Sequence, residues 1–517
     1  MAIVLPGRPS IPPPKWALLE RHIFDAMADA ADAYVATYTR PDGTLVWHSD
    51  QKPWLDAQGR ARAEDGSIVA DVAAALASGA PKLQIWPGVD GSDDGYESFT
   101  SFPLFYLLGA RGSLYEHARK QWGAMTWQFT QYGQVLDDFD KTYDWMHHGE
   151  SSLYLYFLAL ADPKCHQDRE RCVRFAQLYI EEKHGNWDAE RRMIRSPLNG
   201  SGGALTEFTE EQWCTHREVL ADYLPPFRDM LADSDPQFKC LDLNDDAVFE
   251  VFLSRLNERM VGDVPLNLTA TSLVTNAFLY GGRGAAALKD WVLQYLQAWE
   301  QRAEENGGII PDNIGPSGKA GECMPGNSWS GGYYGWRWPH GSMNLLEATL
   351  IAGCNALLLT GERTHLKLLR SQLDVIWAQG KELDPSDVEE GGGSGGFNIQ
   401  AQFAAKSKNK AYESLLANTL HAADYEGEAA AAADPAAGGG KVYKVPCRHT
   451  EEGWCDFRPP KAEPYIFLHY MTFAEEDAAR LEKLAPDGGW KSAQLLHAAA
   501  ADLATAAAAA AADWPRT

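Results

Sequence analysis

Apolar side chains recur at helical spacing along most of the first 380 residues. The stretch from Trp16 to Tyr38 shows the pattern, because its apolar side chains return every three or four positions and share one face of a helix. Further stretches with the same period predict helices of ordinary length. They are residues 97–108, 113–132, 151–161, 167–182, 209–223, 245–259, 268–280, 284–304, 342–360 and 362–379. The chain is therefore predicted to be mainly α.

Long loops separate the predicted helices into pairs. These loops are polar and rich in glycine and tryptophan, and they cover residues 84–97, 137–150, 183–208 and 309–341. Strand patterns are few and short, and a Pro-Asp-Gly turn at 41–43 predicts a hairpin. Helical hairpins whose loops recur at one end predict a closed toroid, the (α/α)6 or (α/α)7 barrel. We expect it to cover residues 1–380, with a local insert at about 56–82.

The character of the chain changes after residue 380. Residues 391–396 are glycine and serine, and residues 428–440 combine alanine with glycine. Such compositions predict flexible segments. Helical patterns return at 475–484 and 492–512. We therefore expect residues 381–517 to form a C-terminal extension that packs on the toroid.

Composition narrows the set of partners. Lys and Arg number 46 against 71 Asp and Glu, a formal net charge of −25, which argues against nucleic acid and anionic membranes. The first 16 residues lack the apolar run of a secretory signal, and no stretch predicts a membrane span. We expect a soluble protein, either cytoplasmic or the mature form of a secreted one. The sequence does not indicate its oligomeric state. The eight cysteines contain no CxxC pair, so free thiols are expected rather than a zinc ribbon.

Residues 309–341, the central loop, hold the richest mixture of side chains for binding a sugar. Their many glycines exclude a regular helix, since each costs about 1 kcal/mol there. Flat apolar faces come from Trp329, Tyr333, Tyr334, Trp336 and Trp338. Polar groups come from Asp312, Asn313, Glu322, Arg337 and His340. The loop predicts a carbohydrate site; the alternative is that the aromatics cover one end of the core and the glycines only form turns.

An acidic segment precedes the helix predicted at 97–108. Asp90, Asp93, Asp94 and Glu97 are the residue types that favour a helix N-terminus. They could also hold a structural calcium ion, although the twelve-residue loop of a calcium-binding hand is absent. We expect no cofactor.

The densest group of titratable side chains lies at 137–150. Its members are Asp138, Asp140, Tyr143, Asp144, His147, His148 and Glu150. A carboxylate beside an imidazole can tune it as a general base. Zinc is disfavoured, because adjacent histidines diverge and the HExxH spacing is absent. The alternative is a capped helix with a satisfied histidine.

Residues 192–203 offer donors for a carboxylate. Arg195 and Asn199 can bind a carboxylate without taking a proton from it. No GxGxxG, Walker A or GxSxG pattern occurs, so nucleotide binding and α/β-hydrolase chemistry have no support from the sequence.

The loop motifs WPGVDGSDDGYE, YDWMHHGE, RSPLNGSGG and WSGGYYGWRWPHG, on a chain of helical hairpins, resemble those of the carbohydrate-active (α/α)-toroid enzymes. These enzymes include polysaccharide lyases, unsaturated uronyl hydrolases and related glycoside hydrolases, and the resemblance covers residues 16–380 in architecture. It implies Tyr or His as base and acid, with Asn, Arg, His or Glu neutralising a uronate. For those roles the resemblance implies Tyr333 or Tyr334, His147 or His148, Asn199, Arg337 and Glu150. Together with the loop compositions above, this gives as catalytic candidates His147, His148, Tyr333, Tyr334 and Glu150. The substrate-binding candidates are Asn199, Arg195, Arg337, His340, Trp329, Trp336, Trp338, Asp94, Asp144 and Asn313.

Three functions are open at this point, all with a carbohydrate as partner. A lyase that acts next to a uronic acid needs a base and a neutraliser of the carboxylate. A glycoside hydrolase needs two carboxyls about 5 to 9.5 Å apart. The carboxyls available for it are Asp93, Asp94, Asp144, Glu150, Asp312 and Glu322. A carbohydrate-binding protein needs the aromatic faces but not the titratable clusters.

The lyase is slightly favoured over the hydrolase. We expect a histidine of the pair 147 and 148 and a tyrosine of the pair 333 and 334 to converge on one pocket with Arg337 and Asn199.

Overall fold

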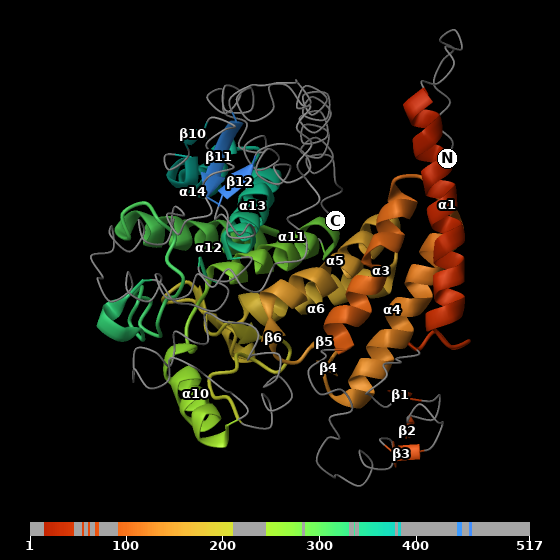
Figure 1. The fold of residues 1–517 in the computed structure, drawn as a ribbon, viewed down its shortest axis with the longest axis horizontal. Helices are drawn as coiled ribbons and strands as arrows, with labels where there is room; N and C mark the ends of the chain where they lie inside the picture. Colours follow the sequence, from red (N-terminus) through yellow and green to blue (C-terminus); the bar gives the residue numbers. More distant parts are fainter. Residues whose placement is uncertain are drawn as a thin grey trace. The chain divides into compact units, whose positions relative to one another are not determined.

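The computed structural model describes residues 15–45, 54–55, 60–62, 68–71, 91–209, 245–281, 285–329, 335–336, 341–377, 381–383, 442–446 and 454–456 (Figure 1). Helices dominate these residues, as the sequence predicts. The chain divides into two compact units. Unit 1 comprises Met1–Asp140 and His147–Arg171, and unit 2 comprises Lys141–Met146 and Cys172–Thr517.

Unit 1 is built on three helices that lie side by side (Figure 1). They are α1 (Lys15–Tyr38), α3 (Gly91–Leu107) and α4 (Gly112–Tyr132). Helix α5 (Trp145–Ala161) adds Tyr154 to their core. The ring of Trp122 lies 4.8 Å from that of Tyr96 and 5.2 Å from that of Tyr154 between centroids. The Tyr154 hydroxyl donates to the carbonyl of Ala118 at 2.6 Å, so the buried tyrosine also satisfies its polar atom.

Short β elements complete unit 1. Strands β1 (Trp54–Leu55), β2 (Arg60–Arg62) and β3 (Ile68–Asp71) form an antiparallel sheet in that order, within or beside the predicted insert. Strands β4 (Val135–Leu136) and β5 (Phe139–Asp140) form a hairpin. The turn predicted at 41–43 is confirmed, because Gly43 N donates to Arg40 O at 2.8 Å and Thr39 bridges Leu45.

Unit 2 holds most of the remaining helices. They are α10 (Asp246–Arg259), α11 (Thr271–Gly281), α12 (Ala285–Glu305), α13 (Gly341–Thr360) and α14 (Lys367–Trp377), with the 3-10 turns η1 (Glu182–His184), η4 (Pro265–Ala270), η5 (Pro325–Asn327) and η6 (Arg363–Leu366). Helix α6 (His166–Ile180) contains the boundary between the units. Helices α11, α12 and α13 pack on one another, and α13 also packs on η4. Asp245 caps α10, because its carboxylate accepts from Ala247 N at 2.9 Å.

The strands of unit 2 are equally short. Strands β6 (Tyr143–Asp144) and β9 (Leu198–Asn199) pair antiparallel, as do β7 (Trp187–Asp188) and β8 (Met193–Ile194). Strands β10 (Lys381–Leu383), β11 (Val442–Pro446) and β12 (Trp454–Asp456) form a third antiparallel sheet.

Several predicted boundaries were wrong. Helix α3 begins at Gly91 and α5 at Trp145, so the ends of the loops predicted at 84–97 and 137–150 are helical. Gly95 and Gly149 disfavoured helix there, but one glycine costs only about 1 kcal/mol, which packing can outweigh. The helices predicted at 268–280 and 362–379 each begin with a 3-10 turn. The helices predicted at 209–223, 475–484 and 492–512 and the flexible segments at 391–396 and 428–440 lie outside the described residues.

Candidate functional site

A buried polar network centred on Asp263 joins several segments of unit 2. Asp263 lies between α10 and η4 and is fully buried. Its backbone forms an antiparallel bridge with Ile314 of the central loop, with N to O distances of 2.8 Å in both directions. A Cβ atom at Gly262 would lie 1.6 Å from Ile314 O, so only glycine permits this close approach.

The Asp263 carboxylate accepts hydrogen bonds from several separate segments. Asn267 Nδ2 of η4 donates to Oδ1 at 2.8 Å, and Ile194 N of β8 donates to Oδ2 at 3.1 Å. The Tyr295 hydroxyl of α12 donates to Oδ1 at 3.0 Å. Arg302 Nη1, also of α12, lies 3.4 Å from Oδ2. Each of these partners is a donor, which is the environment that an ionised carboxylate requires.

Burial and the donors act in opposite directions on Asp263. Burial raises the pKa of its carboxyl to about 6, while the Arg302 guanidinium and the hydrogen bonds hold that pKa down. Burial and the nearby Asp263 charge raise the pKa of Tyr295 well above 10. At neutral pH the centre of the network is therefore an aspartate anion facing a neutral phenol and a guanidinium.

A chain of amides extends the network to Asn199. Asn199 Nδ2 donates to Asn267 Oδ1 at 3.0 Å and to Ser196 O at 2.8 Å, and Asn199 Oδ1 accepts from the Tyr179 hydroxyl at 2.6 Å. Asn199 belongs to β9, whose partner strand β6 places Tyr143 opposite Asn199 and Asp144 opposite Leu198. The backbone that carries Asp144 is thereby joined to Asp263.

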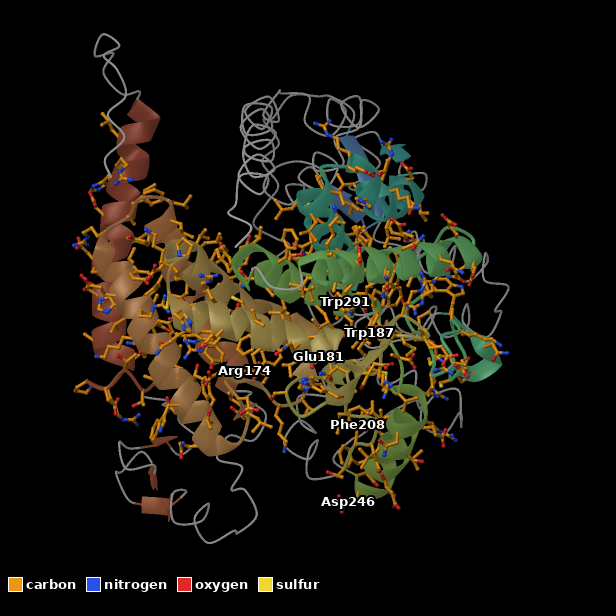
Figure 2. All side chains as sticks on the ribbon, turned by 180° about the vertical axis from the view of Figure 1, so that it is seen from behind. Arg174, Glu181, Trp187, Phe208, Asp246 and Trp291 are labelled. Atoms are coloured by element: carbon orange, nitrogen blue, oxygen red, sulfur yellow. The ribbon has the colours of Figure 1, made fainter. Side chains whose placement is uncertain are left out.

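Helix α12 connects the network to the β7–β8 hairpin. Arg302 Nη2 donates to the carbonyls of Arg191 and Arg192 at 3.1 and 3.2 Å. Trp187 of β7 packs against Trp291 and Tyr295 of α12, at centroid distances of 5.0 and 5.5 Å. Figure 2 shows Trp187 beside Trp291. The hairpin is held by both polar and aromatic contacts.

A second buried node fixes the central loop on either side of residues 330–334. The carboxylate of Asp312 accepts from Trp336 N at 2.8 Å, and Trp336 Nε1 donates to Ile310 O at 2.9 Å. Asp312 N donates to Trp329 O at 2.9 Å. A Cβ atom at Gly335 would lie 2.4 Å from Asp312 Cγ, so glycine lets the backbone meet the carboxylate.

Four residues predicted to bind substrate are buried in this structure. Asn199 is fully buried, and Trp336, Trp329 and Asn313 are 2%, 5% and 6% exposed. Asn313 Oδ1 accepts from Gly321 N at 3.1 Å and its Nδ2 donates to Trp329 O at 3.3 Å. The contacts seen here are structural, and a direct role of these four in substrate binding stays a prediction. They agree with the alternative in which loop aromatics cover the core.

The other predicted site residues lie on several elements of the two units or outside the described part of the chain. Arg195 is half-buried after β8, and Asp94, Asp144, His147, His148 and Glu150 belong to α3, β6 and α5, although their side chains lie outside the described part of the chain. Tyr333, Tyr334, Arg337, Trp338 and His340 lie outside it altogether. His147, His148 and Glu150 belong to unit 1, whereas Asn199 belongs to unit 2. Their convergence on one pocket stays a prediction.

Sequence reasoning missed the centre of the network. Asp263, Asn267, Tyr295 and Arg302 are single polar residues on or between helices, and no motif joins them. The one signal was Gly262-Asp263-Val264-Pro265, a glycine and a proline around an acid between two helices. It also missed Glu347 of α13, whose side chain is exposed but whose pKa is raised because neighbouring atoms remove part of its solvent.

Neither a metal cluster nor a membrane-spanning helix occurs among the described residues. They contain no group of three His, Cys, Asp or Glu side chains that could hold a metal ion. None of their helices is both long and apolar enough to cross a bilayer. Four described cysteines, Cys165, Cys172, Cys323 and Cys354, are free thiols.

The family of the chain follows from its sequence. A family model described as "Domain of unknown function (DUF8034)" matches residues 4–60 and 79–507. The chain belongs to this family. Within the DUF8034 match lie Asp263, Asn199 and the whole central loop, while the gap at 61–78 falls in the predicted insert. No curated protein matches the chain.

Among solved structures the DUF8034 chain is similar to cellobiose 2-epimerase from Spirochaeta thermophila DSM 6192. The identity is 12%, and the match covers 56% of this chain and 74% of the epimerase chain, with a TM-score of 0.24. A TM-score of this size is too low to carry fold or activity from one chain to the other.

Proposed function

We propose that this chain is a carbohydrate-active enzyme whose reaction takes place on the central loop and the other loops rich in titratable residues. The observation that carries the proposal is the buried network. It connects three segments that are rich in sugar-binding and titratable residues. They are the strand with Asp144, the strand with Asn199, and the central loop at Ile314. Rigid support beneath loops of this composition is what a site that positions a substrate needs.

The fold proposed for this enzyme is the (α/α) toroid of residues 1–380, followed by an extension of residues 381–517. Its support is the helical content and the succession of helix pairs joined by long loops. A structure in which the helix pairs do not close into a ring would exclude the toroid.

Within the carbohydrate-active class we propose a lyase that acts next to a uronic acid. A base removes the C5 proton, the bond from C4 to the glycosidic oxygen breaks, and a C4–C5 double bond forms in the uronate. The proton goes to the base and the electron pair to the leaving oxygen, which an acid protonates. The sequence candidates are Tyr334 or His148 for proton transfer and Arg337 for the uronate carboxylate.

The test is incubation with a panel of uronate-containing glycans while the absorbance of the new double bond is followed. Tyr334→Phe and His148→Ala should each lower turnover by roughly 10²-fold or more, the usual contribution of positioned proton transfer. Arg337→Ala should lower turnover chiefly on uronate substrates. Tyr156→Phe, a half-buried tyrosine of α5, serves as the matched control and should leave turnover unchanged. Wild-type protein that produces no double bond on any of these glycans excludes the lyase.

A glycoside hydrolase is the second candidate, and Glu347 is the observation in its favour. Its exposed carboxyl has a raised pKa and no ion pair among the described residues, and it lies on α13 directly after the central loop. A carboxyl of this kind can act as a general acid. Release of reducing sugar without a double bond, abolished by Glu347→Gln but not by Glu362→Gln beyond the end of α13, would replace the lyase by the hydrolase.

A further inference from the structure

Asp263 has a place in the fold that the proposed reaction leaves unused. Its side chain is fully buried, so it cannot touch a sugar, yet β8, η4 and α12 all donate to its carboxylate. Its backbone adds the central loop through Ile314. Ile194 and Arg302 are 69 and 39 residues away from it in sequence. One carboxylate thus joins segments that no local structure would hold together.

The partners of this carboxylate suit only its ionised form. Asn267 Nδ2, Ile194 N and Arg302 Nη1 can donate but cannot accept at those atoms. A protonated Asp263 would set an O–H against these donors and lose one acceptor. Tyr295 alone could turn its hydroxyl to accept. Loss of the charge should therefore loosen the hold on β8 and on the central loop.

We propose that Asp263 is a positioning residue, whose ionised carboxylate holds the β7–β8 hairpin, η4 and the central loop in the arrangement in which the enzyme is active. This inference rests on the proposed function. Among the described residues, the charged and titratable groups that face Asp263 are Arg302 and Tyr295, both on α12, while η4, β8 and the central loop present uncharged amides. Activity should follow the ionisation of one group.

The activity test compares Asp263→Asn with wild type between pH 4.5 and 8. Wild-type kcat should rise with an apparent pKa near 6, while kcat of the variant should be lower at pH 7.5 by roughly tenfold or more and should lack that rise. Asp168→Asn is the matched control, because Asp168 is also buried and ion-paired, with Arg119 at 2.7 Å, but lies in unit 1. It should keep the rise. A folded Asp263→Asn with wild-type kcat and pH profile overturns the proposal.

Tyr295→Phe covers the case in which Asp263→Asn does not fold. It removes one hydrogen bond that lowers the pKa of Asp263, so the acidic limb of the kcat profile should move to higher pH. A residue with a merely structural role would not move this limb. A profile that keeps its position in a folded Tyr295→Phe overturns the proposal.

Hydrogen–deuterium exchange separates this inference from the proposed function, because it needs no substrate. At pH 7.5 the amides of Ile194 and Ile314 should exchange roughly tenfold faster or more in Asp263→Asn than in wild type or Asp168→Asn. Wild type that is inactive on every glycan, with exchange changed as stated, ends the proposed function and supports the role of Asp263 in holding the segments. Active wild type with unchanged exchange in Asp263→Asn ends the inference alone.

Discussion

The close approach of Gly262 to Ile314 shows how a single missing side chain permits the network. The bridge between Asp263 and Ile314 brings the carbonyl of Ile314 to where a Cβ of residue 262 would lie. The overlap is with backbone rather than with the flexible end of a side chain, so no rotamer change can relieve it. At Gly335, by contrast, a Cβ atom would meet the side-chain carboxylate of Asp312, which a hydrogen bond from Trp336 N holds in place.

Gly262→Ala should therefore destabilise the protein by about 3 kcal/mol, the upper part of the range for overpacking. Denaturant unfolding followed by circular dichroism measures the change. Gly123→Ala is the matched control, since Gly123 is inside α4 and a Cβ there meets nothing within 4 Å. It should stabilise by about 0.5–1 kcal/mol. Equal effects of the two substitutions would contradict the steric account.

Asp263 should also make stability depend on pH. Its pKa is 3.8 before burial and about 6 in the fold, so the folded state binds the proton more tightly. This contribution to stability is fully present below pH 3.8 and is lost as the pH rises through about 6. Wild type should lose stability relative to Asp263→Asn between pH 4.5 and 7.5, by something of the order of 2 kcal/mol.

Denaturation midpoints of both proteins at the two pH values test this. Stability and activity should respond in opposite directions, because burial favours the neutral carboxyl and the donor geometry favours the anion. If the midpoint of wild type differs from that of Asp263→Asn by the same amount at both pH values, Asp263 does not titrate in this range.

Among the secondary-structure elements, the helices were predicted best from the sequence. Helices α1, α4, α12 and α13 begin and end within a residue of their predictions. The apolar faces of α1, α4 and α12 have a helical period, whereas α13 is apolar over most of its length. Strands β4 to β9 span two residues each, too short for any alternation to show. The network escaped prediction for a related reason, since Tyr179, Asn199 and Asn267 meet only after separate elements have packed.

The pairing of β6 and β9 should depend on Tyr179 of α6. Tyr179→Phe leaves the buried Oδ1 of Asn199 without the donor seen at 2.6 Å, which should cost about 1–3 kcal/mol. Tyr156→Phe is the matched control. Burial alone raises the pKa of Tyr156, with no contribution from a hydrogen bond, so removal of its hydroxyl should cost close to nothing. Thermal unfolding of the two variants measures the difference. Similar melting temperatures would mean that the Asn199 amide finds another partner.

The DUF8034 match spans both units of the whole molecule. The residues that define the family therefore extend beyond the buried network of unit 2. The predicted toroid of residues 1–380 and the division at residue 380 remain predictions. The predicted site also stays a prediction. Strands β6 and β9 and the central loop are linked through Asp263, whereas His147 and His148 belong to unit 1. Long-range assembly of this kind cannot be read from local periodicity.

The sequence separation of the network partners has a consequence for how the chain folds. Ile194 and Asp263 are 69 residues apart and Asn199 and Asn267 are 68 apart, so loop-closure entropy must be overcome before these bonds can form. The helices have local contacts and can form first. After dilution from denaturant, helical ellipticity should recover before the amides of Ile194 and Ile314 become protected, and activity should return with the slower step. Recovery of all three at one rate would mean that the helices form only when the network closes.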